Sequence, residues 1–265
     1  MIADAANILP SDKILAIIPA RMASSRLPGK PLVAIGGEAM IVHVWRRAVQ
    51  AVIGRVIVAA AEAEIAGKVR AAGGEAVLTP PDLESGSDRV HAALETIDKW
   101  RHCRLVINIQ DDLLTIDPDT IRSCVAILND HAIDMAIAAA PIVDQGDIDD
   151  PNVVKIAGEF YGSSVILHAR DFRRKPDPRD GKDVGRYFHH IGLYAWRRET
   201  LERFVALPVS ARESRYRLEQ LRAPDSGMRI AAGLVDKIPL GVDTPDDLKR
   251  ARQLLAGRNG VFSPA

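Results

Sequence analysis

Short apolar runs alternate with longer stretches of helical spacing through the first half of this chain, and this alternation limits the possible folds more than any other feature. The runs that predict strands lie at residues 14–18, 55–60, 76–78, 105–109 and 135–140. The stretches that predict helices lie at residues 40–52, 62–72, 87–100 and 119–128. Strand–helix alternation of this kind is typical of an α/β fold, in which a mostly parallel sheet has helices on both faces.

The second half of the chain is less regular. Residues 153–156 and 164–168 favour a pair of antiparallel strands, and residues 170–186, which are rich in Arg, Lys, Asp and Pro, predict a loop. The remaining predicted elements are strands at residues 190–195 and 229–235 and helices at residues 197–206, 211–222 and 245–255. Thr244 and Pro245 suit the N-cap and the first position of the last helix. We find no internal repeat and expect one domain over residues 1–265.

The charge balance and the apolar content of the chain limit the kinds of partner that it can bind and the cellular location that we expect for it. The 265 residues include 35 Lys and Arg against 35 Asp and Glu, so the formal net charge is zero and no extended nucleic-acid surface is expected. No run of about 18 apolar residues predicts a membrane span. Residues 1–10 contain Asp4 and no basic segment typical of a signal peptide, so we expect a cytoplasmic location. Cys103 and Cys124 match no metal-ligand spacing and suit small apolar positions.

A loop with three cations follows the first predicted strand. Arg21, Arg26 and Lys30 lie there among small residues, and we call residues 21–30 the cation loop. Small residues let a ligand approach the backbone, and a loop after a strand has N–H groups free to donate. Arg offers a bidentate fork and Lys a compact charge, and both bind phosphate. The cation loop therefore predicts binding of a nucleoside triphosphate, although its spacing is not that of a Walker A loop.

Acidic residues follow two of the predicted strands. Gln110, Asp111 and Asp112 come directly after strand 105–109, and Asp243 lies just before the last helix. Ligands in such folds gather at the carboxyl ends of strands, and Mg²⁺ takes one or two carboxylates together with water and phosphate oxygens. Each acidic segment alone also fits an ordinary interpretation, as a polar turn or a helix start. Together with the cation loop, Asp112 and Asp243 predict a site for a polyphosphate and Mg²⁺.

Other positions give weaker signals. Arg89 ends the turn Ser-Gly-Ser-Asp-Arg, which enters a helix and either binds an anion or is an ordinary cap, with Ser87 as a candidate N-cap. His190 precedes a strand and is either a ligand or a structural histidine. Glu219 and Gln220 lie on the charged helix predicted over residues 211–222, where a solvated face is the default interpretation.

A set of motifs between residues 17 and 248 resembles a known family in both content and order. The motifs are IIPARMASSRLPGKPL, MIVHVWRRA, SGSDR, DPNVVK, HHIGLYAWRR, LEQLR and GVDTPDDL. They resemble the CMP-Kdo synthetases, which are 3-deoxy-manno-octulosonate (Kdo) cytidylyltransferases, and the resemblance extends over about residues 14–255. It implies a Rossmann-like fold of the nucleotide-diphospho-sugar transferase type, with a smaller sugar-binding and dimerisation lobe at about residues 140–220, and a homodimer.

The resemblance also implies an activity. CMP would be transferred from CTP to the anomeric hydroxyl of Kdo with release of pyrophosphate, in an Mg²⁺-dependent step of lipopolysaccharide or capsule synthesis. Arg21 and Lys30 would hold the triphosphate with help from Arg26, and Arg21, Lys30 and Asp112 would be catalytic. The other implied roles are nucleotide binding by Arg89 and Gln110, metal binding by Asp112 and Asp243, and binding of the sugar acid by His190, Glu219 and Gln220.

This chain departs from the usual pattern of that family at two strand ends. The family usually has Gln-Gly-Asp-x-Pro where this chain has Gln-Asp-Asp-Leu-Leu, so that Asp111 stands in place of a glycine. It also has Thr-Asp where this chain has Ala60 and Ala61. Two alternatives therefore stay open: a cytidylyltransferase for a related acidic sugar, and a non-catalytic nucleotide-binding paralogue. Retention of Asp112 and Asp243 beside the cation loop favours an enzyme.

Overall fold

The chain divides into two compact units. The computed structural model describes residues 10–160, 166–176 and 187–256. One unit, which we call the cation-loop unit, comprises Leu15–Trp100, Asn108–Pro118 and Pro239–Ala265. The other, the mixed-sheet unit, comprises Met1–Ile14, Arg101–Ile107 and Asp119–Ile238. Because each unit takes three separate stretches of chain, neither could be delimited from composition along the sequence.

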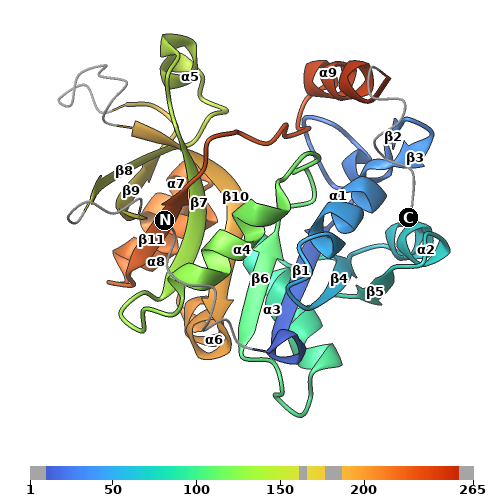
Figure 1. The fold of residues 1–265 in the computed structure, drawn as a ribbon, viewed down its shortest axis with the longest axis horizontal. Coiled ribbons are helices and arrows are strands. Elements are labelled where there is room, and N and C mark those ends of the chain that lie inside the picture. Colours follow the sequence, from blue (N-terminus) through green and yellow to red (C-terminus); the bar gives the residue numbers. More distant parts are fainter. Residues whose placement is uncertain (1–9, 161–165, 177–186, 257–265) are drawn as a thin grey trace. The chain divides into compact units, whose positions relative to one another are not determined.

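The cation-loop unit is built on parallel strands (Figure 1). Its strands, α-helices and one 3₁₀ helix (η3) are, in chain order, β1 (Ile14–Ala20), η3 (Lys30–Leu32), β2 (Ala34–Ile35), β3 (Glu38–Ala39), α1 (Met40–Val49), β4 (Arg55–Ala60), α2 (Ala63–Ala71), β5 (Glu75–Leu78), α3 (Gly86–Ile97) and α9 (Pro245–Ala256). β4 pairs in parallel with β1 on one side and with β5 on the other, whereas the short strands β2 and β3 form a separate antiparallel pair. The predicted alternation of parallel strands and helices is thus confirmed here.

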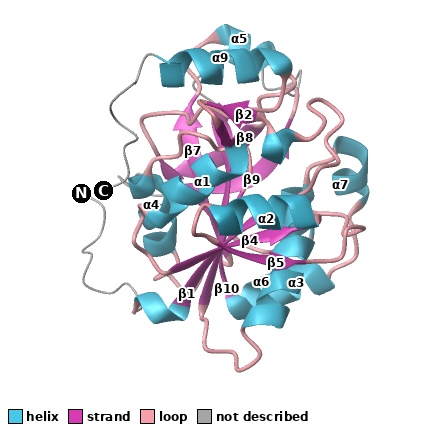
Figure 2. Cartoon of the chain, turned by 90° about the vertical axis from the view of Figure 1, so that its right-hand side faces the viewer, coloured by secondary structure: helices cyan, strands magenta, loops and turns pink. Residues whose placement is uncertain are grey.

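Strand β4 is covered on both faces. Every side chain from Val56 to Ala60 is buried, and successive side chains of a strand point to opposite faces. Helices α1, α2 and α3 all contact β4, and α2 and α3 also contact β5 (Figure 2). A continuous apolar run such as VIVAA, residues 56–60, is therefore needed, because an alternating pattern would place polar side chains under a helix.

The last helix, α9, packs on residues from the beginning of the chain, beside β2 and β3 (Figure 1). Leu248 of α9 belongs to a buried cluster that also contains Leu27 of the cation loop and Val242. Thr244 is the N-cap that the sequence predicted: its Oγ1 accepts a hydrogen bond from the Asp247 N–H at 3.2 Å, and its own N–H donates to Asp247 Oδ2 at 2.9 Å. This packing places the segment before α9 within reach of the cation loop.

The mixed-sheet unit contains both parallel and antiparallel strand pairs. Its elements are η2 (Ser11–Lys13), β6 (Leu105–Ile109, divided between the units after Ile107), α4 (Pro118–Ile127), β7 (Met135–Pro141), α5 (Gln145–Asp149), β8 (Lys155–Phe160), β9 (Ile166–Arg173), β10 (Tyr187–Arg197), α6 (Arg198–Ala206), α7 (Ala211–Tyr216), η5 (Glu219–Leu221), α8 (Arg222–Asp225) and β11 (Ile230–Leu234). β11 pairs in parallel with β7. β10 is antiparallel to β7 and β8, and β9 is antiparallel to β8 and β11.

The strand pair predicted from residues 153–156 and 164–168 is confirmed as β8 and β9. A connection as short as residues 161–165 suits an antiparallel pair, since a parallel pair needs a crossover of a dozen residues or more. The predicted loop over residues 170–186 is wrong at its start, because β9 continues to Arg173, which pairs with Lys155. Residues 164–165 and 177–186 lie outside the described residues.

The single helix predicted over residues 211–222 is wrong. Helix α7 ends at Tyr216, and Arg217 adopts a φ of 53°, in the left-handed region that ends a helix. The 3₁₀ helix η5 and the short helix α8 follow. This change of direction buries Gln220, which is 3% exposed, so the solvated face expected for this position is also wrong.

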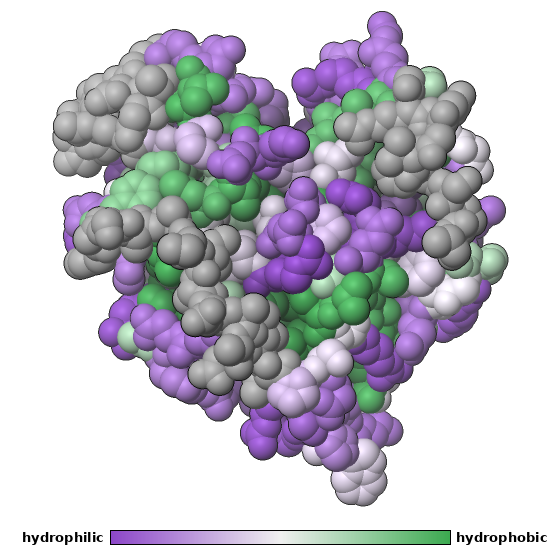
Figure 3. Space-filling view, viewed as in Figure 1, coloured by the Kyte–Doolittle hydropathy of each residue, from purple (hydrophilic) through white to green (hydrophobic). Residues whose placement is uncertain are grey.

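Polar and apolar side chains are interspersed over the face of the described residues in the space-filling view (Figure 3). None of the helices in the described part of the chain combines the length and the apolar character that crossing a lipid bilayer requires.

Cys103 and Cys124 are both buried thiols, and burial raises the pKa of Cys124 to about 12. They occupy the small apolar positions that the sequence predicted.

Gly158 in β8 leaves no room for a side chain. A Cβ at this position would lie 2.4 Å from the main-chain oxygen of His168 in β9. We expect Gly158→Ala to lower the free energy of unfolding by about 1–3 kcal/mol in urea denaturation, since the strands must move apart. Gly67→Ala is the matched control, because Gly67 is exposed on α2 with nothing within 4 Å of its Cβ position. That control should raise the free energy by about 0.5–1 kcal/mol, and effects of the same sign would contradict the prediction.

Candidate active site

The cation loop turns back on its own beginning. The Met22 carbonyl oxygen accepts hydrogen bonds from the N–H groups of Ser24, at 2.9 Å, and Gly29, at 3.2 Å. Gly29 has a φ of 70°, a conformation that glycine adopts without steric cost. The Met22 N–H in turn donates to Glu62 Oε2 at 3.0 Å. The loop is therefore anchored at the end of β1 by a carboxylate that follows β4.

Lys30, at the start of η3, is the centre of a cluster of charged side chains. Its Nζ lies 2.9 Å from Asp111 Oδ1, 3.1 Å from Asp112 Oδ2 and 3.2 Å from Asp243 Oδ1. The Lys30 side chain is 11% exposed, so these interactions take place largely out of water. Arg26 completes the cluster, with its Nη2 2.8 Å from the other oxygen of Asp243. We call these five residues the charge cluster.

Backbone pairing brings the two acidic segments together. Leu113 and Gly241 form an isolated antiparallel β-bridge, and the Val242 N–H donates to the Asp112 carbonyl oxygen at 3.2 Å. Asp112 and Asp243 are therefore held side by side. The same pairing lets Asp243 contact Lys30, which is 213 residues away in the sequence. All of these residues belong to the cation-loop unit, so the cluster is formed within one compact unit.

Burial and charge act against each other in the charge cluster. Burial alone lowers the pKa of Lys30, but Asp111, Asp112 and Asp243 outweigh it and raise that pKa above its ordinary value. Burial raises the pKa of Asp112 to about 6, and the negative charges of Asp243 and Asp111 add to this rise while Lys30 opposes it. Lys30 is therefore protonated and positively charged. A further positive charge beside Asp112 would stabilise its ionised carboxylate.

The donor set of the charge cluster fits a divalent cation. Three carboxylate oxygens converge within 3.2 Å of one positively charged atom, Lys30 Nζ, which marks where a cation is favourable. Oxygen ligands are those that Mg²⁺ prefers, and three carboxylates face only the two cations Lys30 and Arg26 within the cluster. The residues present could therefore hold Mg²⁺ once a triphosphate binds Lys30.

Arg89 is buried against a backbone turn. Its Nη1 donates to Thr79 Oγ1 at 2.6 Å and to the Pro80 carbonyl at 2.8 Å, and its Nη2 donates to the Pro81 carbonyl at 3.3 Å. Burial lowers the pKa of Arg89, and the positive charge of Arg21 lowers it further. The guanidinium thus fixes the turn after β5, and its predicted contact with the nucleotide stays a prediction.

The N-cap of α3 is not the residue that the sequence suggested. Ser85 caps this helix through a reciprocal pair of hydrogen bonds with Asp88, a capping box. Ser87, the expected cap, instead lies inside the first turn and is buried.

The residues predicted for the sugar acid lie in the mixed-sheet unit. His190 is on β10 and is 9% exposed, with the rings of Phe172 and Tyr194 each centred 5.4 Å from its own. The Tyr194 hydroxyl lies 3.5 Å from Gln220 Oε1, so one tyrosine connects His190 and Gln220. Glu219 opens η5 and is half-buried. Their role in binding a sugar acid stays a prediction.

His190 makes the stability of the mixed-sheet unit sensitive to acid. Its Nε2 is buried without a hydrogen-bond partner among the described residues, and burial lowers its pKa to about 3, with His189 adding to the effect. An unfolded histidine takes up a proton near about pH 6.5. Between these values the unfolded state holds a proton that the folded state lacks, so the free energy of unfolding falls as the pH falls.

We therefore expect His190→Phe to reduce this decline by up to about 1.4 kcal/mol per pH unit. Urea denaturation at a series of values from about pH 7 to about pH 4.5 measures it. The matched control is His131→Gln, an exposed histidine of the same unit, which should leave the slope unchanged. Equal slopes for the wild type and His190→Phe would show that the buried imidazole does not govern acid sensitivity.

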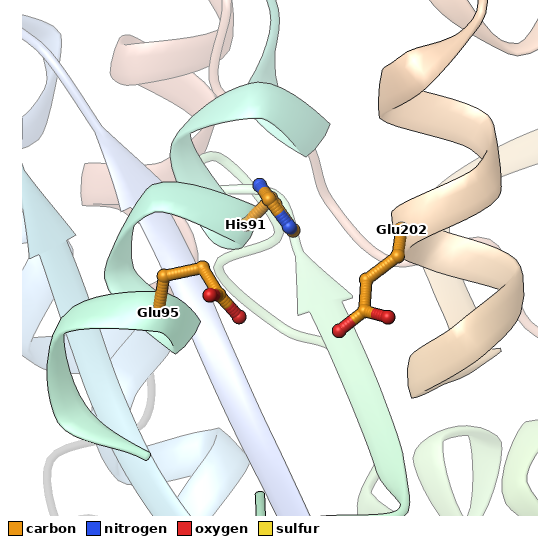
Figure 4. Close-up of side chains that lie close together, drawn as sticks. All are labelled: His91, Glu95 and Glu202. Atoms are coloured by element: carbon orange, nitrogen blue, oxygen red, sulfur yellow. The ribbon is translucent and has the colours of Figure 1, made fainter. Parts of the chain in front are cut away.

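Three further side chains with metal-binding chemistry lie on α3 and α6. His91 and Glu95 are one turn apart on α3, and Glu202 is on α6 (Figure 4). Glu202 already has two guanidinium partners, Arg101 at 2.8 Å and Arg198 at 2.9 Å. The hydrogen bond from Arg101 is the main cause that lowers the pKa of Glu202. Its charge is thus balanced by arginines, and we assign no metal to these residues.

The structure unites most, but not all, of the predicted phosphate and metal residues. Arg26, Lys30, Asp112 and Asp243 meet in the charge cluster, whereas Arg21 is exposed at the end of β1 and Gln110 is half-buried directly after β6.

Sequence reasoning missed two contacts. It gave no role to Glu62, which anchors the cation loop, and it did not foresee that Asp111 contacts Lys30. Their positions in the sequence could have indicated these contacts, because Glu62 and Asp111 both lie just after a buried strand.

The cation loop and the carboxylates meet in a unit built on parallel strands, and cations beside carboxylates are the donor set that a nucleotidyltransferase would need for a triphosphate and a metal. Residues 15–230 match the family model described as cytidylyltransferase. The chain belongs to the family of the 3-deoxy-manno-octulosonate cytidylyltransferases.

Relatives of that name match nearly the whole chain. The relative from Methylobacterium radiotolerans is 54% identical over 244 residues, which cover 92% of this chain and 97% of the relative. The relative from Rhodopseudomonas palustris is 52% identical over 249 residues, which cover 94% of this chain and all of the relative. The sequence-based resemblance to this family is therefore confirmed.

Solved structures support the same conclusion. A structure of CMP:2-keto-3-deoxy-manno-octonic acid synthetase complexed with CTP matches with a TM-score of 0.82 at 34% identity, over 93% of this chain and 99% of that one. A UDP-glucose pyrophosphorylase matches with a TM-score of 0.66 at 12% identity, over 93% of this chain and 99% of that one, which supports the fold alone. These matches confirm the predicted α/β fold of the nucleotide-diphospho-sugar transferase type.

Proposed function

We propose that this chain transfers CMP from CTP to Kdo, with release of pyrophosphate and with Mg²⁺ as its metal. Membership of the family supports the substrates, and the charge cluster supports the chemistry. The observation that carries the proposal is that Lys30 of the cation loop contacts Asp112 and Asp243 within one compact unit. A triphosphate and a divalent cation would need these same residues, in this proximity.

The proposed reaction is an in-line substitution at phosphorus. The anomeric hydroxyl of Kdo attacks the α-phosphorus of CTP, the new P–O bond forms as the bond to the β-phosphate oxygen breaks, and the hydroxyl proton is released. Arg21, Arg26 and Lys30 bind the phosphates and neutralise charge that develops on the leaving pyrophosphate. Mg²⁺ held by Asp112 and Asp243 would polarise the phosphoryl oxygens. Most of the acceleration comes from positioning.

The remaining parts of the proposal concern binding and assembly. Gln110 and Arg89 bind the nucleotide, and His190, Glu219 and Gln220 bind the sugar acid. We further propose a cytoplasmic homodimer, with a dimerisation lobe at about residues 140–220, whose product enters lipopolysaccharide or capsule synthesis. The mass of the purified protein in solution, measured by light scattering, tests the homodimer, and a monomer mass would contradict it.

The activity is tested by pyrophosphate release from purified protein with CTP, Mg²⁺ and Kdo. Release that requires Kdo and Mg²⁺ would support the proposal. Release only with another acidic sugar, in a panel of sugar acids, would replace Kdo by a related acceptor. Binding of CTP in a calorimeter without any release would identify a non-catalytic nucleotide-binding paralogue. A chain that neither binds CTP nor releases pyrophosphate would contradict the nucleotide-binding proposal altogether.

A further inference from the structure

Asp111 is as much a part of the charge cluster as the two aspartates that the proposed function assigns to Mg²⁺. Its Oδ1 makes the shortest of the three contacts with Lys30 Nζ, at 2.9 Å against 3.1 Å for Asp112 and 3.2 Å for Asp243. The Asp111 side chain is 12% exposed, almost the same as that of Asp112. A carboxylate in this setting is costly to bury unless a cation faces it.

Lys30 cannot balance three carboxylates. It contributes one positive charge to Asp111, Asp112 and Asp243, and Arg26 forms a salt bridge with Asp243. Pairs of charges that are mostly shielded from water interact more strongly than exposed pairs, so this excess of negative charge is a substantial attraction for a further cation. Triphosphate binding increases it, because phosphate oxygens then share the charge of Lys30.

The contacts of Lys30 Nζ also define a competition. The ammonium group lies within hydrogen-bond distance of one oxygen from each carboxylate, which are the atoms that a divalent cation would use. A cation and the Lys30 ammonium cannot both occupy the space between the three oxygens. In the nucleotide-free chain, Lys30 must therefore move before a metal can bind these three oxygens together.

We propose that Asp111 is a third carboxylate ligand of the divalent cation and that Lys30 competes with that cation for all three aspartates. The inference rests on the proposed function, since it concerns the same metal site. It predicts that the chain binds a divalent cation even without nucleotide, weakly because of Lys30 and measurably because of Asp111. When CTP binds, Lys30 moves from the carboxylates to the phosphates and the cation takes its place.

The test is titration of the nucleotide-free protein with MnCl₂, followed by the electron paramagnetic resonance signal of free Mn²⁺. We expect Asp111→Asn to weaken Mn²⁺ binding at least about tenfold, because it removes one charged ligand, and Lys30→Met to strengthen it at least about tenfold, because it removes the competitor. Glu64→Gln is the matched control, since Glu64 is an exposed carboxylate on α2 of the same unit. It should bind Mn²⁺ like the wild type.

Each possible result decides the inference. Wild-type Mn²⁺ affinity in Asp111→Asn would remove Asp111 from the ligand set, and unchanged or weaker binding by Lys30→Met would refute the competition. No binding by the wild type would overturn both. Asp111→Gly serves as a second variant if Asp111→Asn does not fold, as judged by circular dichroism. The titration uses neither CTP nor a sugar, so it can succeed where pyrophosphate release fails, and the two proposals fail separately.

Discussion

Asp112→Asn is expected to lower the rate of pyrophosphate release at saturating CTP and sugar acid by at least about 100-fold. The substitution keeps the size of the side chain and one oxygen, but removes the negative charge that would hold Mg²⁺ against the phosphates. The main-chain carbonyl oxygen of Asp112 accepts a hydrogen bond from the Val242 N–H, a contact that the substitution leaves intact. The loss should therefore appear in kcat and not in the fold.

The control for this experiment is Glu64→Gln, which removes a negative charge from the same unit without touching the charge cluster. Its rate should match that of the wild type. The circular dichroism spectrum and melting temperature of Asp112→Asn should stay close to those of the wild type. A variant that is folded and loses less than about fivefold in rate would show that Asp112 is not a metal ligand in the reaction.

Arg222→Met is expected to lower the free energy of unfolding by about 3–5 kcal/mol. Arg222 Nε and Nη2 donate to the two carboxylate oxygens of Glu213 at 2.8 and 2.6 Å, and the side chains are only 3% and 9% exposed. The guanidinium also lies 4.8 Å from the ring centroid of Phe204. Removal of one partner leaves a buried, uncompensated carboxylate, which is the main cost.

The double variant Glu213→Gln, Arg222→Met separates this cost from general damage. A glutamine can still make the capping interaction of Glu213 with the Ser210 N–H, and it carries no charge. We expect the double variant to recover part of the lost stability in urea denaturation, so the two substitutions will not be additive. Additive losses, or a loss below about 1 kcal/mol for Arg222→Met, would contradict a buried ion pair of this strength.

The first half of the fold could be predicted from the sequence because its strands are buried on both faces. Mostly apolar runs such as RVIVAA and LVINI are typical of buried strands, and β4 and β6 follow them residue for residue. The cation loop and the acids after β6 were found for a related reason: a strand end in a parallel sheet is where a ligand is expected.

The second half was harder because its turns depend on tertiary contacts. Nothing in ARESRYRLEQLR marks Arg217 as the residue with a positive φ, since arginine has no preference for that conformation. The end of α7 and the burial of Gln220 follow from the Glu213–Arg222 pair and from packing, neither of which has a local signature. Likewise, that Asp111 contacts Lys30 is a matter of side-chain direction, which the sequence does not encode locally.

The β-bridge between Leu113 and Gly241 has a consequence for synthesis of the protein on the ribosome. The cation loop and Asp112 emerge well before Gly241 of the bridge, Asp243 and the capping residue Thr244. A nascent chain therefore carries Lys30 and two of its carboxylates long before the third can dock. The charge cluster can be completed only after Asp243 has emerged, so a nascent polypeptide that stops short of this residue cannot assemble it.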